Sequence, residues 1–148
     1  MPVSSLARAF SNLDIASQIW DISSVPADPK RKEVRWVGSS LGDLRSFPKD
    51  VRIVMGVALN AAQLGHKHSV AKPLKHMGSA GVLEIVDDFD GNTYRAIYTV
   101  RFAEVVYVLH AFQKKSKRGV QTPRSDIDLV NLRLKHAEED YKANVKKK

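Results

Sequence analysis

The chain has 148 residues, the usual length of one compact domain, and 43% of them are hydrophobic while 27% are charged. It contains no cysteine, which excludes disulfides, thiol nucleophiles and cysteine-based zinc sites. A formal charge of +8 and a pI near 9.8 favour a polyanionic partner such as RNA, DNA or an acidic protein. No apolar run approaches the roughly 20 residues of a membrane-spanning helix, and the start lacks a secretory signal pattern, so we expect a cytoplasmic protein.

Residues 1–31 differ in composition from the rest of the chain and are predicted to be an N-terminal extension and linker. Residues 6–22 have the spacing of one short amphipathic helix. The Pro-, Ser- and Asp-containing segment 23–30 is typical of a linker. The domain itself is predicted to span residues 32–141, and a basic C-terminal tail is predicted over residues 142–148.

The first half of the predicted domain contains one strand and two helices. Residues 32–38 alternate between charged and apolar side chains, which indicates a strand with one buried face. The serine pair 39–40 offers an N-cap for a short helix, and Pro48 suits the first turn of a second helix that Gly65 ends. Apolar residues recur at helical spacing in this second helix, so we expect it to pack against a sheet.

The second half predicts an antiparallel meander of three strands. The predicted strands are residues 81–86, 93–100 and 104–112. Asp90 and Gly91 supply the turn chemistry of a hairpin between the first two strands. Alternation along the middle strand places Tyr94 on the face that meets the helices and Arg95 on the open face.

Two connecting segments flank this meander. Residues 66–81 form a polar connector with three histidines, His66, His68 and His76, but they have no acidic companion at ligand spacing. We therefore expect no metal site and no cofactor. After a basic loop, Thr122 is predicted to cap a last helix that has Pro123 at its first position.

The stretch 94–118 concentrates the chemistry-bearing side chains. Two apolar, aromatic strands are joined at 101–104, and the second runs directly into a cluster of cationic residues. Segment 110–124 carries five lysines or arginines and no carboxylate, whereas four carboxylates gather at 84–90. This polarised charge predicts a sheet that presents a phosphate-binding surface.

Several motifs in this region, together with the order of elements, resemble one known family. The most specific is LHAFQKKSK at 109–117, followed by Thr122-Pro123, Asp126-Ile127 and an arginine, Arg133, on the last helix. A weaker match is the Tyr-Arg-x-x-Tyr pattern that begins at Tyr94. Over roughly residues 32–141 the chain resembles the phage-derived branch of the RelE/HigB-like toxins of type II toxin–antitoxin systems.

The resemblance implies a small α+β fold. It consists of a twisted antiparallel sheet, built from a strand, two helices and a three-stranded meander, with helices packed on one face and a C-terminal helix. Many members of the family are metal-independent endoribonucleases that cut mRNA, often in the ribosomal decoding site. An antitoxin from the adjacent gene, commonly a helix-turn-helix protein, neutralises the toxin.

The resemblance also implies roles for particular residues. Metal-independent RNA cleavage requires a base for the 2′-hydroxyl proton, an acid for the 5′-oxygen and cations for the phosphorane. Arg95 is the expected phosphate clamp, His110 the proton-transfer group and Lys114 the third catalytic candidate. The candidates for RNA binding, by charge or by base stacking, are Lys72, Lys75, Tyr94, Phe112, Lys115, Lys117 and Arg118.

Competing interpretations remain for each of these residues. Arg95 could pair across the hairpin with Glu84 or Asp87, His110 could be a histidine satisfied by the backbone, and Phe112 could belong to the core. Strand 81–86 also lacks the basic residues that serve catalysis in the best-known RelE branch, so either the active site is assembled differently or the activity is reduced or absent. The alternatives to an endoribonuclease are a non-catalytic phage-derived nucleic-acid- or protein-binding module and a ParE-type gyrase inhibitor.

Overall fold

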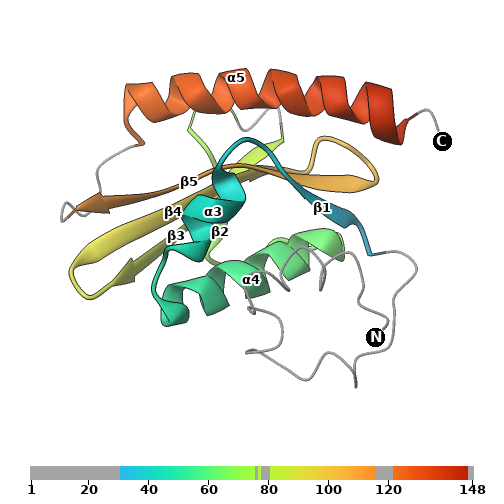
Figure 1. The fold of residues 1–148 in the computed structure, drawn as a ribbon. Coiled ribbons are helices and arrows are strands. Elements are labelled where there is room, and N and C mark those ends of the chain that lie inside the picture. The colour runs from blue at the N-terminus through green and yellow to red at the C-terminus, as the bar shows by residue number, and fades with distance from the viewer. Residues whose placement is uncertain (1–30, 76, 78–80, 116–121, 147–148) are drawn as a thin grey trace.

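The computed structural model describes residues 31–75, 77, 81–115 and 122–146. Apart from its last residue, the predicted N-terminal extension lies outside these ranges. Figure 1 shows a central sheet with helices on either side of it. In chain order the elements are β1 (Glu33–Trp36), α3 (Ser40–Arg45), α4 (Lys49–Gln63), β2 (Ala71–Pro73), β3 (Val82–Phe89), β4 (Asn92–Thr99), β5 (Val105–Lys115), α5 (Arg124–Asp140) and the π-helical turn η3 (Tyr141–Val145).

The sheet has five strands in the order β1-β5-β4-β3-β2. The predicted meander is confirmed, because β3 pairs antiparallel with β4 and β4 pairs antiparallel with β5. Two pairings differ from the prediction. β1 runs parallel to β5, so the sheet is mixed, and the short strand β2 forms within the predicted connector and pairs antiparallel with β3.

Helices cover both faces of the sheet (Figure 1). On one face, α3 and α4 bury Leu44, Met55 and Leu59 against the sheet. On the other face, α5 contributes Val130 and Leu134 to a second apolar cluster. The α+β class and the C-terminal helix are confirmed. The face opposite α3 and α4 is covered as well, because the apolar side of α5 has to be buried.

The alternation predicted for β4 is confirmed in direction. Tyr94 and Tyr98 pack into the cluster under α3 and α4, while Ile97 packs into the cluster under α5. Helix starts differ from the prediction by one residue, because Pro48 and Pro123 are themselves the N-cap residues of α4 and α5. Thr122 therefore has no capping role, and its hydroxyl binds a carboxylate of β3 instead.

Candidate functional site

One row of register partners crosses the sheet on the face that α5 covers. Lys72 of β2 is opposite Glu84 of β3, Glu84 is opposite Ile97 of β4, and Ile97 is opposite His110 of β5. In the next row Arg95 is opposite Phe112. Neighbouring strands are about 4.8 Å apart, so the backbones at Glu84 and His110 are separated by roughly 10 Å. The sheet therefore gathers four of the predicted site residues, Lys72, Arg95, His110 and Phe112, around Glu84.

Glu84 is the centre of the first half of this site. Its Oε1 accepts a hydrogen bond from Arg95 Nη1 at 2.9 Å and lies 3.7 Å from Lys72 Nζ, while its Oε2 accepts from Thr122 Oγ1 at 3.2 Å. Glu84 is 5% exposed and Arg95 is 6% exposed, whereas 64% of the Lys72 side chain is exposed. The buried carboxylate of Glu84 thus faces two of the cationic candidates, Arg95 and Lys72.

The expectation that Arg95 points to an open face is wrong. Helix α5 covers that face, and a guanidinium buried there requires a nearby opposite charge. Glu84 supplies it, which is the competing interpretation in which Arg95 pairs across the hairpin. Any anion that binds the guanidinium of Arg95 competes with this carboxylate.

His110 is the centre of the second half. Its Nε2 lies 2.6 Å from Asp126 Oδ1, in the first turn of α5. The ring stacks on Phe112 with centroids 4.8 Å apart, and the His110 side chain is 8% exposed. Its Nδ1 is buried and has no hydrogen-bond partner among the described residues. The partner of His110 is thus a helix carboxylate and not the backbone group of the competing interpretation.

An irregularity in β5 directs His110 toward α5. The β4–β5 register shifts between Ile97 and Tyr98, so that Ile97 is opposite His110 but Tyr98 is opposite Val108, with Leu109 as the extra residue. Such bulges re-aim side chains and are frequent beside functional sites. Arg133 of α5 donates from Nη1 to the carbonyl of Leu109 at 3.0 Å. The motif arginine therefore fastens the helix to the bulge.

The remaining site candidates are distributed unevenly. Tyr94 is 5% exposed, lies on the opposite face and packs edge-on against Phe47, so base stacking by Tyr94 is not supported. Phe112 is half-buried and packs against the cluster under α5. Lys75 is exposed and Lys114 is half-buried. The side chain of Lys115 and residues Lys117 and Arg118 lie outside the part of the chain that the structure describes.

The site also contains three residues that sequence reasoning does not assign to it. The sequence suggests Glu84 as a hairpin partner, Thr122 as a helix cap within the resemblance motif, and Asp126 as part of that motif, but it gives none of them a role in the site. The signal available for Asp126 and Thr122 is their place in the resemblance motif beside His110. Their contacts arise because the start of α5 lies over the row.

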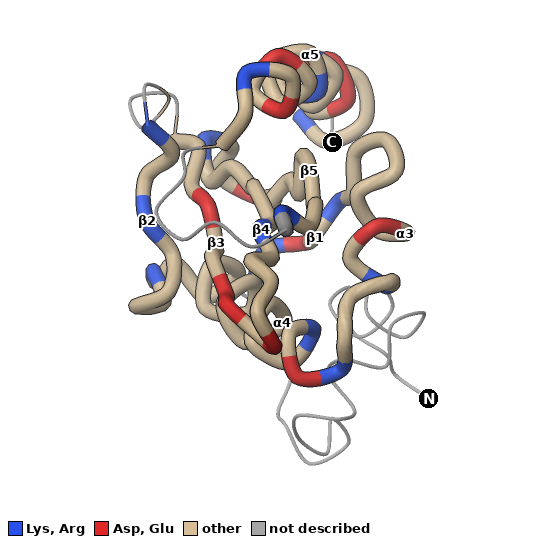
Figure 2. Tube along the Cα trace, turned by 90° about the vertical axis from the view of Figure 1, so that its left-hand side faces the viewer, with Lys and Arg blue, Asp and Glu red and all other residues tan. Residues whose placement is uncertain are grey.

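Charge is arranged unevenly around the site. Figure 2 shows cationic segments along β2 beside acidic segments on β3. Near the β3–β4 turn, burial raises the pKa of Asp87, and the negative charges of Asp88 and Asp50 raise it further. The acidic end of the hairpin therefore disfavours a phosphate, while the β2 edge, with exposed Lys72 and Lys75, favours one.

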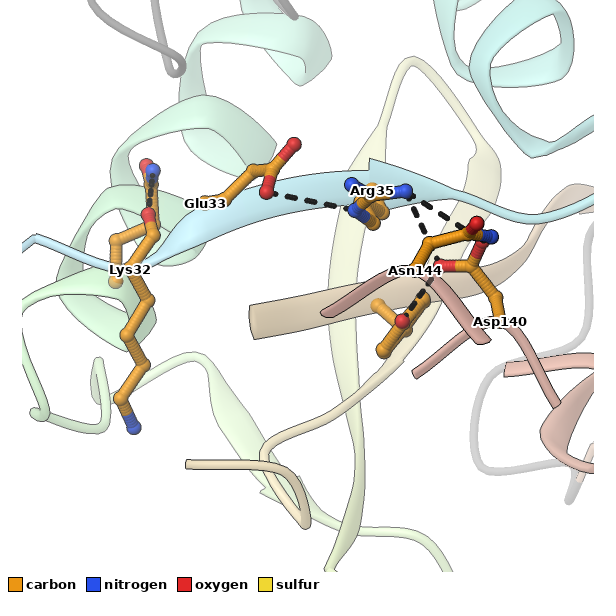
Figure 3. Close-up of polar contacts among 7 residues, drawn as sticks. Lys32, Glu33, Arg35, Asp140 and Asn144 are labelled. Carbon is orange, nitrogen blue, oxygen red and sulfur yellow. Dashed lines mark hydrogen bonds and ion pairs between the residues drawn. The ribbon is translucent and has the colours of Figure 1, made fainter. Parts of the chain in front are cut away.

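A second polar cluster anchors the far end of α5 (Figure 3). Asp140 accepts hydrogen bonds from Arg35 Nη1 at 3.2 Å, from Tyr107 Oη at 2.7 Å and from Asn144 Nδ2 at 2.7 Å. Burial by itself would raise the pKa of Asp140, but these hydrogen bonds and the charge of Arg35 outweigh it and lower the pKa below 3.8. Burial and the bond to Asp140 raise the pKa of Tyr107. An acidic residue at a helix C-terminus opposes the helix dipole, and these partners offset that cost.

Two further observations concern metal-binding side chains and helix length in the described part of the chain. Within the described ranges there is no group of three or more histidine or carboxylate side chains placed to hold a metal ion. Nor is any helix in the described part of the chain long and apolar enough to cross a membrane.

Comparison with known proteins gives one finding. Searches of curated proteins and of solved structures found no match. The family described as phage derived protein Gp49-like (DUF891) matches residues 42–135, which run from α3 into α5 and include Lys72, Glu84, Arg95, His110 and Asp126. Because the match covers more than half of the 148 residues, the chain belongs to this phage-derived family, a RelE/HigB-like family of toxins from toxin–antitoxin systems.

Proposed function

We propose that this protein is an endoribonuclease toxin that cleaves mRNA by metal-independent attack of the 2′-hydroxyl, on the ribosome, and that a helix-turn-helix antitoxin neutralises it. Family membership supports the toxin assignment. The observation that carries the cleavage proposal is the His110–Asp126 contact of 2.6 Å, one row from Arg95. A histidine held by a carboxylate beside a guanidinium combines proton transfer with phosphate stabilisation.

Each candidate has a separate task in this reaction. His110 exchanges a proton with the RNA, and Arg95 neutralises the charge that develops on the phosphorane. Lys72, at the exposed β2 edge, binds the backbone phosphate as a point charge, together with Lys114 on β5. The net charge of +8 draws the polyanion to the protein.

The proposal requires a local rearrangement. His110 and Arg95 are each less than 10% exposed, so RNA reaches them only when a covering side chain moves aside. Phe112, which stacks on the imidazole, and Thr122, which binds Glu84, are both half-buried and lie at the margin of the row. In this proposal RNA enters beside these two side chains while α5 stays in place, so Asp126 keeps its contact with His110.

The test is cleavage of a defined single-stranded RNA by the purified chain with a metal chelator present. We expect products with a 2′,3′-cyclic phosphate and a 5′-hydroxyl, and no cleavage when the RNA carries 2′-deoxyribose at the cleaved position. His110→Ala should abolish cleavage, whereas His136→Ala, at an exposed histidine of α5, should not. Cleavage by His110→Ala equal to that of the wild type would refute the assignment of His110.

The burial of His110 and Arg95 favours one second candidate, a non-catalytic module that binds nucleic acid. In that case RNA stays intact in the same assay. Binding then weakens steeply with salt, because phosphate contacts release counterions. Growth arrest in the absence of the neighbouring gene, with mRNA intact, would favour this candidate over the nuclease.

A further inference from the structure

We propose that Asp126 is a positioning residue that fixes the imidazole of His110, and that Nδ1 of His110 is the nitrogen that exchanges a proton with RNA. The inference rests on the proposed nuclease function and deepens it. Asp126 Oδ1 lies 2.6 Å from His110 Nε2. Turning the ring by half a turn would bring the carbon Cε1 to the carboxylate in place of Nε2, and the hydrogen bond would be lost. The contact therefore identifies the two ring nitrogens.

The chemistry of the contact assigns the proton. A neutral imidazole has one N–H donor and one acceptor nitrogen, and an ionised carboxylate only accepts. In the neutral form of His110, Nε2 therefore carries the hydrogen that Asp126 accepts, and the lone pair lies on Nδ1. This is how a partner on one nitrogen sets the chemistry available at the other.

The hydrogen bonding of Nδ1 is consistent with a nitrogen that accepts a proton from the substrate. It is buried and has no hydrogen-bond partner among the described residues, although buried polar atoms are nearly always paired. A structural histidine would be expected to bind through both nitrogens. A nitrogen without a hydrogen-bond partner among the described residues is available to take the proton of a 2′-hydroxyl once RNA displaces the side chains that cover it.

The fold fixes where Asp126 lies. Arg133 follows Asp126 by seven residues, close to two helical turns, so both side chains project from the same side of α5. Arg133 binds the carbonyl of Leu109, and Asp126 binds the side chain of the next residue, His110. Val130, between them on the helix, is fully buried. These contacts set the position of α5 along β5, so the carboxylate is held against Nε2.

Asp128 offers a matched control for Asp126. It lies two residues further along α5, 66% of its side chain is exposed, and its ion pair is with Arg124 at 3.6 Å. Substitution at Asp128 removes one carboxylate from the same turn of the helix without touching His110. Any effect of charge alone, or of the helix N-terminus, should appear equally in both variants.

The experiment combines ¹⁵N NMR of the His110 ring in the full chain without RNA with the RNA cleavage assay. In the wild type we expect a protonated Nε2 whose hydrogen is protected from exchange, and an unprotonated Nδ1. Asp126→Ala should lose that protected hydrogen and cleave about 10²-fold more slowly, the lower end of general acid–base contributions. Asp126→Glu should recover part of the Nε2 protection and part of the cleavage rate, and it tests the inference even if the alanine variant does not fold. Asp128→Ala should behave as the wild type.

The outcomes separate this inference from the proposed function. If the wild type cleaves RNA but carries its proton on Nδ1, or if Asp126→Ala keeps both the protected Nε2 hydrogen and the wild-type rate, the positioning role is overturned and the nuclease stands. If the ring shows the expected state but the wild type does not cleave RNA, the proposed function is overturned, and with it the role of Nδ1 in catalysis.

Discussion

Glu84 and Arg95 form an ion pair in which both side chains are more than nine-tenths buried. Glu84→Gln keeps the size of the side chain and one acceptor oxygen but removes the charge that faces the guanidinium. Removing one partner of a buried ion pair costs about 3–5 kcal/mol, and whole domains are stable by only about 5–15 kcal/mol. Because glutamine still accepts one hydrogen bond, we expect the lower end, a loss of about 3 kcal/mol in the free energy of unfolding.

Urea unfolding at neutral pH measures this loss, provided that the dependence on denaturant is unchanged between variants. Lys72→Met is the control, because Lys72 is 3.7 Å from the same carboxylate but mostly exposed, and should cost at most about 1 kcal/mol. The double variant Glu84→Gln/Arg95→Gln should be less destabilised than the sum of the two single variants. A Glu84→Gln variant within about 0.5 kcal/mol of the wild type would refute the reasoning.

Other predictions concern the C-terminal end of α5, the acidic turn between β3 and β4, and the contact of Gly38 with Arg133 of α5. Tyr107→Phe removes the 2.7 Å bond to Asp140 and should cost about 1.5–3 kcal/mol in urea unfolding; an unchanged midpoint would contradict it. Because the folded pKa of Asp140 is lowered, its contribution is complete above pH 3.8 and is lost as pH falls through the folded value, so the stability gap to Asp140→Asn should shrink in acid. The pKa of Asp87 is raised, so its negative charge destabilises the folded state. Asp87→Asn should therefore stabilise the protein at pH 7 but not below pH 3.8, and a lower stability of the variant at pH 7 would contradict this. Gly38→Ala should cost roughly 1–2 kcal/mol by thermal or urea unfolding, because φ is +59° and the new methyl group would lie 2.7 Å from Arg133 Nε; an unchanged stability would contradict that strain.

The fold is largely readable from the sequence because its main elements carry periodic apolar patterns. Alternation predicts the three strands of the meander, and helical spacing predicts α4 and α5. β2 escapes prediction because it has three residues, one of them proline, and exists through its pairing with β3. The parallel pairing of β1 with β5 and the face that α5 covers depend on contacts between distant segments, for which the chain has no local signal.

The sequence identifies some residues of the site but not the side chains that they contact. Arg95 and His110 are identifiable, yet the carboxylates that hold them come from 11 residues earlier and 16 residues later in the chain. The orientation of His110 is also hidden. β5 is apolar on both faces, so alternation cannot reveal that a bulge at Leu109 moves His110 to the face under α5.

Helix α5 both builds and closes the candidate site, and this decides which variants are informative. Its Asp126 and Asp140 contacts are 14 residues apart, about 21 Å along one helix, and Asp140 is held by Arg35 and Tyr107 (Figure 3). Loss of toxicity after substitution at Arg95 or at the Asp140 anchor therefore reports on folding as much as on chemistry, because these side chains hold the sheet and the helix together. His110 is a more informative position, because its Nδ1 has no hydrogen-bond partner among the described residues. The exposed histidine His136 of α5 provides a control substitution in the same protein. Cleavage measured for these two histidine variants, with stability measured alongside, separates catalysis from packing at this site.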